Sequence, residues 1–167
     1  ISEPGLKSQM LKVLKNEYFS AHSKITKSNY YIIAVPTPLI NKKPDISYVE
    51  KAIKAIIPYL DIGDALIIES TSPVGTTDKM KNYIYKKRPK LKNSIFIAYC
   101  PERVLPGNAM KEIINNDRVI GGVDQKSTNH IIKFYSNFIK GELVPANAKT
   151  AEMCKLVENA YRDNQIA

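Results

Sequence analysis

The sequence predicts an α/β fold in which helices cover both faces of a parallel sheet. Three apolar runs of strand length, at residues 30–35, 65–69 and 94–98, are each followed by a loop, and segments with helical periodicity separate them. Each loop carries Pro, Thr, Ser or Glu. Because strands that alternate with helices pair in parallel through right-handed crossovers, we expect the three loops to lie along one edge of the sheet.

The remaining elements follow from the same periodicities. The expected order is a helix over 7–21, a strand over 30–35, a helix from 45 or 47 to 60, a strand over 65–69, a helix from 77 to about 89, strands over 94–98 and 119–122, a helix over 127–139, a strand over 142–144 and a helix from about 147. Gly63 and Pro89 end two of these helices. A boundary is expected near Pro145, which gives residues 1–145 as one domain and 146–167 as the start of a further helix.

The loop over 99–107, Tyr-Cys-Pro-Glu-Arg-Val-Leu-Pro-Gly, is the most informative segment of the chain. Pro101 and Pro106 fix backbone torsions, so Glu102 and Arg103 are presented in a preset geometry. The loop follows a predicted buried strand, and open α/β sheets bind ligands beyond the carboxyl ends of their strands. A plain turn is the alternative interpretation of this loop taken alone.

Thr37 and Thr71 occupy the equivalent place after the two preceding strands. Each residue taken singly is typical of a cap or turn. Their repeated position after successive strands predicts that Thr37, Thr71 and Glu102 converge on one crevice.

Composition bounds the possible functions. The chain has 167 residues, 44% hydrophobic and 25% charged, which is ordinary for one globular domain. No run approaches the roughly 20 apolar residues of a membrane span, and no signal peptide opens the chain, so we expect no membrane and a cytoplasmic protein. The net charge of +9 raises a nucleic-acid hypothesis. However, much of it comes from lysines in helical stretches, which are usually solvated helix faces.

A metal site has little support from the sequence. Cys100 and Cys154 are far apart and lack ligand spacing, and His22 and His130 are isolated. Cys100 precedes the Glu102 loop but has no neighbouring His to deprotonate it. We therefore expect both thiols to be reduced, partly buried residues.

Five motifs together resemble a known family, the UDP-glucose/GDP-mannose dehydrogenases, which are nucleotide-sugar 6-dehydrogenases. The motifs are Ala-Val-Pro-Thr-Pro at 34–38 with Pro-Asp at 44–45, Glu-Ser-Thr-Ser-Pro-Val-Gly-Thr-Thr at 69–77, Cys-Pro-Glu-Arg-Val-Leu-Pro-Gly-Asn at 100–108, Asn-Asp-Arg-Val-Ile-Gly-Gly at 116–122, and Ala-Glu-Met-Cys-Lys-Leu-Val-Glu-Asn-Ala-Tyr-Arg-Asp at 151–163. The third and fourth most resemble its UDP-N-acetyl-D-mannosamine dehydrogenase branch. Pro106 stands where the glucose-specific branch tends to have Glu, which weakens a UDP-glucose assignment.

The resemblance implies a Rossmann-like sheet, NAD as cofactor, a UDP-sugar as substrate and a homo-oligomeric full-length enzyme that serves surface polysaccharide synthesis. It assigns the cofactor to Val35, Pro36, Thr37, Ser70 and Thr71. In the family, a sugar C6 alcohol is oxidised to a carboxylate in two hydride transfers, through a covalent intermediate on a cysteine.

The resemblance also assigns the reacting sugar to Glu102, Arg103, Val104 and Leu105 and to the predicted terminal helix. Lys155 and Asn159 are four residues apart and share one helix face. A cation and an amide there can stabilise a developing oxyanion, although a solvent-facing Lys beside an Asn is the plainer interpretation of the pair alone. In the family, Thr71 and Glu102 arrange the catalytic water and assist thioester hydrolysis.

Two parts of the family pattern are missing from the sequence. The chain contains no Gly-x-Gly-x-x-Gly string for the dinucleotide pyrophosphate, and the family's catalytic cysteine lies beyond the matched motifs. We therefore expect an internal fragment, inactive alone, whose sheet lacks its first strands. A 6-dehydrogenase of another UDP-N-acetylhexosamine or of UDP-glucose, a basic nucleic-acid-binding module and a non-catalytic interaction module remain alternatives.

Overall fold

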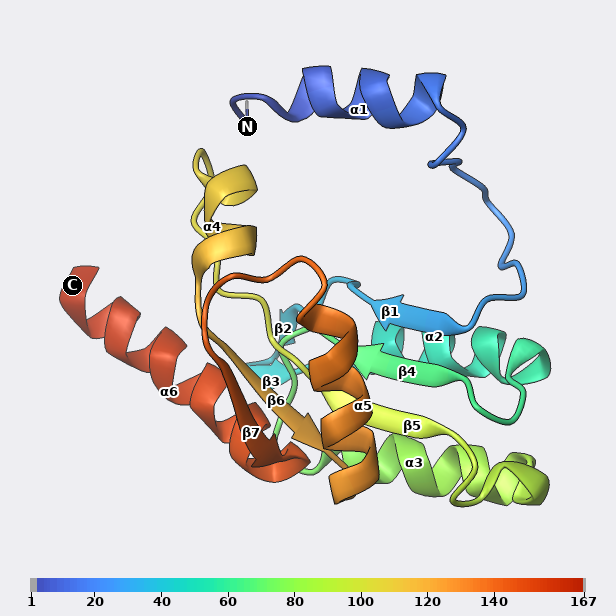
Figure 1. The fold of residues 1–167 in the computed structure, drawn as a ribbon. Helices are drawn as coiled ribbons and strands as arrows, with labels where there is room; N and C mark the ends of the chain where they lie inside the picture. Colours follow the sequence, from blue (N-terminus) through green and yellow to red (C-terminus); the bar gives the residue numbers. More distant parts are fainter. Residues whose placement is uncertain (1–2, 167) are drawn as a thin grey trace.

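A five-stranded sheet forms the centre of the computed structural model, which describes residues 3–166 (Figure 1). Its strand order is β1-β4-β5-β6-β7. The strands are β1 (Tyr30–Ile33), β4 (Ala65–Ile68), β5 (Phe96–Tyr99), β6 (Arg118–Gly122) and β7 (Leu143–Asn147). A separate hairpin consists of β2 (Leu39–Ile40) and β3 (Lys43–Pro44). The α/β class predicted from the sequence is thus confirmed.

The sheet departs from the predicted parallel arrangement at one pairing. β1, β4 and β5 pair in parallel, as do β6 and β7, but β6 runs antiparallel to β5. Only two residue pairs join β5 to β6, at Ala98 with Gly122 and Tyr99 with Gly121. β6 therefore begins beyond the carboxyl end of β5 and runs back toward it, because the chain between these strands makes no full crossover.

Helices lie on both faces of the sheet. The helices that the structure describes are α1 (Leu6–Lys15), α2 (Ser47–Ile56), α3 (Thr76–Lys87), α4 (Ala109–Asn115), α5 (Gln125–Tyr135) and α6 (Ala148–Ile166), with short 3₁₀ turns at Ile57–Tyr59 and Pro89–Leu91. α5 covers one face, and α2, α3 and the start of α6 cover the other (Figure 1). β7 continues through Pro145 to Asn147, so the strand gives way to α6 slightly later than the sequence predicts.

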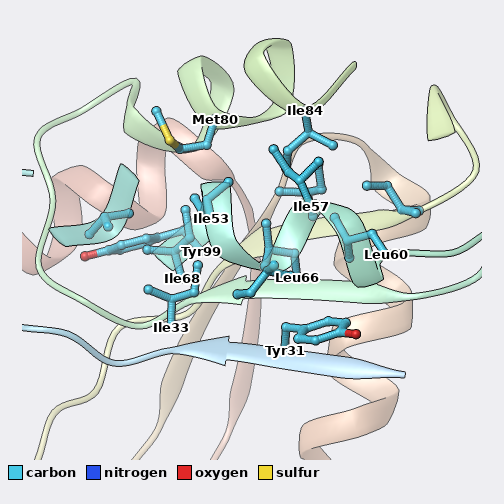
Figure 2. Close-up of a cluster of buried hydrophobic side chains, with 14 of the residues drawn as sticks. Tyr31, Ile33, Ile53, Ile57, Leu60, Leu66, Ile68, Met80, Ile84 and Tyr99 are labelled. Carbon is cyan, nitrogen blue, oxygen red and sulfur yellow. The ribbon is translucent and has the colours of Figure 1, made fainter. Parts of the chain in front are cut away.

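Two hydrophobic clusters hold these layers together. All four residues of β4 are buried, and they alternate between the faces. Leu66 and Ile68 pack with Ile53 and Ile84 of α2 and α3 (Figure 2). Ala65 and Ile67 pack in the second cluster, which α5 covers. The central strand is therefore apolar throughout, as is usual for parallel strands between two helical layers.

The first helix is shorter than predicted. α1 ends at Lys15 and not near Ala21, because Glu17 adopts a positive φ of 58° that a helix cannot continue. Its apolar stripe is not buried, with Leu11 60% exposed and Leu14 48% exposed, and the helix stands apart from the sheet in Figure 1. The Glu3 carboxylate links this segment to the body, since it accepts hydrogen bonds from the amides of Gly107 at 2.6 Å and Ala109 at 3.0 Å.

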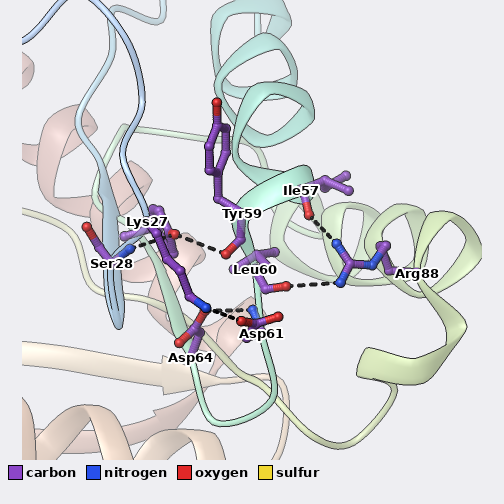
Figure 3. A network of polar contacts seen from close by, with 9 residues as sticks. Lys27, Ser28, Ile57, Tyr59, Leu60, Asp61, Asp64 and Arg88 are labelled. Carbon is purple, nitrogen blue, oxygen red and sulfur yellow. Dashed lines mark hydrogen bonds and ion pairs between the residues drawn. The ribbon is translucent and has the colours of Figure 1, made fainter.

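Polar contacts close the end of the sheet opposite the predicted crevice (Figure 3). The Arg88 guanidinium donates to the carbonyls of Ile57 at 3.0 Å and Leu60 at 3.2 Å, which satisfies acceptors at the end of α2 and its 3₁₀ extension. Asp64 accepts from the Asp61 amide at 2.7 Å, and Lys27 pairs with Asp61. These contacts fix the turn into β4. The longer loops that follow β1, β4 and β5 lie at the opposite end of these strands.

His130 of α5 belongs to an aromatic stack across β1 and β5. Its ring lies 3.7 Å from that of Phe96, and its Nε2 is 2.9 Å from the Tyr30 hydroxyl. Burial, with a smaller contribution from the Lys133 charge, lowers the pKa of His130. The unfolded chain therefore binds this proton at a higher pH than the folded chain does.

We expect the free energy of unfolding to decrease as the pH falls below about 6.5, the ordinary pKa of histidine. His130→Gln should flatten this decrease, and His22→Gln should not, because His22 is exposed and outside the stack. Urea denaturation at pH 7.5 and pH 5 measures the difference. An equal loss of stability in wild type and His130→Gln would assign the pH dependence to other groups.

Candidate functional site at the carboxyl ends of the parallel strands

The loops after β1, β4 and β5 meet at one edge of the sheet. The strands are in register, with Ile33 opposite Ile68 and Ile68 opposite Tyr99, so each loop leaves the sheet at the same level. The loops enclose a cleft of about 310 Å³. It is lined by Ala34, Val35, Pro36, Thr37, Glu69, Ser70, Thr71 and Glu102. The structure therefore brings Thr37, Thr71 and Glu102 together.

A second cavity of about 340 Å³ adjoins this cleft and shares Thr37 and Thr71 with it. Its other walls are the β2–β3 hairpin, the Ser72–Pro73 segment and α6, which contributes Leu156 and Asn159. Thr37 and Thr71 therefore border both compartments. Asn159 lines the second compartment and Glu102 lines the first.

Ser70 joins two of the loops that form the cleft. Its hydroxyl accepts a hydrogen bond from the Val35 amide at 2.8 Å and donates to the Val35 carbonyl at 2.9 Å. Ser70 is 6% exposed. These bonds hold the first loop against the second and so fix the relative positions of Thr37 and Thr71.

Lys155 reaches the third loop from α6. It is 8% exposed, and its Nζ donates to the backbone carbonyl of Glu102 at 2.5 Å. Burial lowers the pKa of Lys155, and the nearby carboxylates of Glu102 and Glu158 partly offset this effect. The ammonium therefore lies beside the predicted catalytic loop but does not line either cavity, unlike Asn159 one turn later.

The rest of this loop is fixed to α4 and α6. Arg103 pairs with Glu158 at 2.7 Å, and its carbonyl accepts from Asn116 Nδ2 at 2.8 Å. The Leu105 amide donates to Glu112 Oε2 at 2.8 Å, and the Val104 amide donates to the Glu102 carboxylate. Arg103, Val104 and Leu105 lie outside the linings of both cavities, so their contact with substrate stays a prediction.

A buried polar cluster beside the cleft was not predicted from the sequence. Glu69 Oε1 accepts from the Arg118 guanidinium at 3.1 Å and from the Tyr135 hydroxyl at 2.5 Å. Arg118 is 5% exposed and lies 5.2 Å from the centre of the Tyr135 ring. The signal in the sequence was Arg118 itself, a charged residue at the start of an apolar strand, which must find a partner when it is buried.

Cys100 lies next to this cluster and is fully buried. Its sulfur is 3.9 Å from the Arg118 guanidinium. Burial nevertheless raises the pKa of Cys100 to about 11. The thiol is therefore protonated near neutral pH. Cys100 and Cys154 are both free thiols, as expected, but Cys100 is fully and not partly buried.

Within residues 3–166, no three His, Cys, Asp or Glu side chains gather closely enough to hold a metal ion. Of the helices that the structure describes, none combines the length and the apolar character needed to cross a membrane.

Comparisons with known proteins identify the family of this chain. Residues 1–139 match the model of the UDP-glucose/GDP-mannose dehydrogenase family, NAD binding domain. A UDP-N-acetyl-D-mannosamine dehydrogenase of Methanocaldococcus jannaschii is 47% identical over 170 residues, which cover 99% of this chain and 39% of that protein. An NDP-N-acetyl-D-galactosaminuronic acid dehydrogenase of Ralstonia nicotianae is 42% identical over 176 residues, covering 100% of this chain and 42% of the relative.

The fold comparison gives the same result. The structure of a UDP-D-ManNAc dehydrogenase from Pyrococcus horikoshii matches with a TM-score of 0.91 and 40% identity, over 98% of this chain and 40% of that one. This chain thus spans about two fifths of the length of these relatives. Because the family model matches residues 1–139, most of the length of the chain, the chain belongs to the UDP-glucose/GDP-mannose dehydrogenase family.

Proposed function

We propose that this chain is part of an NAD-dependent UDP-N-acetyl-D-mannosamine 6-dehydrogenase, which oxidises the C6 alcohol of the sugar to a carboxylate. The observation that carries the proposal is the convergence of Thr37, Thr71 and Glu102 on one cleft at the carboxyl ends of parallel strands. The name UDP-N-acetyl-D-mannosamine dehydrogenase, carried by relatives that are 42–47% identical, supports the choice of sugar.

The cleft fits part of a dinucleotide. Val35 and Pro36 offer apolar surface, and Thr37 and Thr71 offer hydroxyl groups that can donate or accept hydrogen bonds. Together with Ser70, these residues would hold the cofactor against the ends of β1 and β4. NAD supplies the hydride acceptor, which protein side chains lack.

The residues around the second cavity suit the reacting sugar. Asn159 lines that cavity, and Lys155 is held one turn earlier on α6, beside the backbone of Glu102. Lys155 and Asn159 would donate hydrogen bonds to the oxygen that develops negative charge during oxidation. Thr71 and Glu102 would orient a water molecule for hydrolysis, and the backbone of Arg103, Val104 and Leu105 would contact the nucleotide sugar.

The complete active site would need parts of the parent polypeptide besides this chain. The relatives are about two and a half times as long. β1 is an edge strand of the described sheet, so the backbone groups along its outer side could pair with a further strand. Tyr30 and Ile32, which project from one face of β1, are 36% and 45% exposed. We infer that the pyrophosphate-binding turn and the catalytic cysteine lie in those parts, with residues 1–145 in the NAD-binding domain and 146–167 in a helix that continues toward the oligomer interface.

The cellular role follows from the proposed chemistry. An enzyme that uses NAD and a UDP-sugar would act in the cytoplasm as a homo-oligomer, and its product, UDP-N-acetylmannosaminuronate, would supply surface polysaccharide synthesis. Neither nucleic acid nor a membrane is needed as a partner.

NADH formation by the full-length enzyme tests the proposed substrate. We expect kcat/KM to be highest for UDP-N-acetylmannosamine, lower for UDP-N-acetylgalactosamine and lowest for UDP-glucose, with absorbance at 340 nm as the measurement. The 167-residue chain alone should form no NADH above the buffer rate. Preferred oxidation of UDP-glucose would contradict the sugar assignment, and clear turnover by the chain alone would contradict its description as a fragment.

A further inference from the structure

The Glu69 carboxylate is held rigidly at the wall of the cleft. It follows β4 directly, and its anchors come from two other elements, Arg118 at the start of β6 and Tyr135 at the end of α5. The side chain of Arg118 is 6% exposed and that of Glu69 is 18% exposed. A charge-assisted hydrogen bond and a second donor therefore fix the orientation of this carboxylate.

Both anchors bind the same oxygen atom. Among residues 3–166, Arg118 and Tyr135 donate to Oε1, and Oε2 receives no hydrogen bond from this part of the chain. Oε2 is not buried, because Tyr99 Oη is the one side-chain oxygen or nitrogen of residues 3–166 that is both buried and without a hydrogen-bond partner. Oε2 is therefore accessible. Because Glu69 lines the cleft with Thr37, Thr71 and Glu102, an oriented acceptor is available to a ligand there.

The charge of this acceptor restricts what it can bind. An ionised carboxylate accepts hydrogen bonds and donates none, and it repels phosphate groups. Both ligands of the proposed reaction carry a pyrophosphate. The adenosine half of NAD and the sugar also carry donors, but the nicotinamide riboside half alone combines donors, an amide N–H₂ and two hydroxyl groups, with a cationic ring that a carboxylate attracts.

The position of the cleft points to the same half of the cofactor. Hydride transfer requires the nicotinamide ring to lie against the reacting carbon of the sugar. Glu102 belongs to the same cleft as Glu69, and Lys155 contacts the Glu102 backbone. The portion of the dinucleotide nearest to Glu69 would therefore be the portion nearest to the reaction.

We propose that Glu69 Oε2 accepts a hydrogen bond from the nicotinamide riboside half of NAD, and that Arg118 and Tyr135 are positioning residues that orient it. This inference rests on the proposed function. It adds a binding residue whose side chain distinguishes the cationic end of the cofactor from its pyrophosphate.

The test is the affinity of the full-length enzyme for NAD, measured by calorimetric titration. Glu69→Gln should raise the Kd for NAD about tenfold, the scale for a hydrogen bond to a charged group, and should leave the Kd for the UDP-sugar unchanged. Glu142→Gln is the matched control, because the Glu142 side chain is exposed and lines neither cavity, and it should leave both constants unchanged.

An analogue identifies the donor. In 3-acetylpyridine adenine dinucleotide a methyl group replaces the amide N–H₂. If the amide is the donor, Glu69→Gln should bind this analogue as tightly as wild type does; a tenfold loss with the analogue as well would assign the bond to a ribose hydroxyl. Either result supports a donor in this half of the cofactor.

Tyr135→Phe is a second variant, which keeps the inference testable if Glu69→Gln does not fold. It removes the Tyr135 hydroxyl that binds Glu69 and leaves the ion pair between Arg118 and Glu69 intact. It should raise the Kd for NAD about threefold without altering the Kd for the UDP-sugar, a pattern that a merely structural role would not produce. An unchanged Kd for NAD in both variants would overturn the inference. The proposed function would still stand if wild type binds NAD and oxidises the UDP-sugar.

Discussion

Replacing Lys155 with alanine should lower kcat of the full-length enzyme by about 100-fold or more, the scale for the loss of one oxyanion donor. The ammonium is buried against the Glu102 backbone, where the low dielectric strengthens its interaction with a developing negative charge. Binding of the UDP-sugar should change much less, because this interaction strengthens mainly in the transition state. Steady-state kinetics together with a titration of the sugar separate the two effects.

Two variants control for other roles of α6. Lys155→Arg should restore little activity, because a planar guanidinium does not place its charge where an ammonium would. Lys149→Ala, in the first turn of the same helix, should leave kcat unchanged, since that side chain is 64% exposed. An unchanged kcat with a lower melting temperature in Lys155→Ala would show that Lys155 is a structural residue.

Replacing Glu152 with alanine should destabilise the fold by about 3 kcal/mol, because it leaves several buried donors without an acceptor. Glu152 is fully buried on α6, and its carboxylate covers the start of α3. Oε2 accepts from the Gly75 amide at 2.6 Å, and Oε1 accepts from the amide of Thr77 at 2.8 Å and from its hydroxyl at 2.6 Å. The carboxylate also lies at the positive end of the α3 dipole.

Thermal unfolding measures this loss, which should lower Tm by about 10 °C for a chain of this size. Glu142→Gln again serves as the control, and its Tm should match that of wild type. Glu152→Gln should fall between wild type and alanine, because an amide keeps one acceptor oxygen but loses the charge. A change of less than about 2 °C in Glu152→Ala would contradict the assigned role of the carboxylate.

Much of the fold could be predicted because its signals are local and periodic. The apolar runs of β1, β4 and β5, and the helices between them, appear in the sequence as strand-length and helix-length patterns. Their parallel order then places Thr37, Thr71 and Glu102 at one edge. Three of the five motifs that resemble the family lie on these same loops, and the other two lie on β6 and α6, so the sequence led to the family that the comparisons show.

The elements that were missed have weaker local signals. The β2–β3 hairpin turns at Asn41 and Lys42, which both adopt positive φ, and the expected glycine of such a turn is absent. α4 spans only seven residues, about two turns, so its apolar residues Met110, Ile113 and Ile114 are too few to show a helical period. The antiparallel pairing of β6 depends on the path of the whole 100–117 segment, which no local pattern specifies.

The buried polar cluster around Glu69 could not be predicted from the sequence for a different reason. Arg118, Tyr135 and Cys100 are far apart in sequence from Glu69, and their contacts exist only when β4, β6 and α5 have packed. Likewise, the helical spacing of Lys155 and Asn159 was visible, but the bond from Lys155 to the Glu102 carbonyl was not. Residue types and spacing predict which groups share an edge or a face, whereas the partner of each buried charge depends on tertiary packing.

The number of NADH molecules formed per sugar tests the central claim most directly. With the full-length enzyme, excess NAD and a limiting amount of UDP-N-acetylmannosamine, the account predicts two NADH per sugar and a uronate product, because the alcohol is oxidised by two successive hydride transfers. Absorbance at 340 nm at the end of the reaction gives this ratio. One NADH per sugar with an aldehyde product, or no NADH from any UDP-N-acetylhexosamine, would contradict the account.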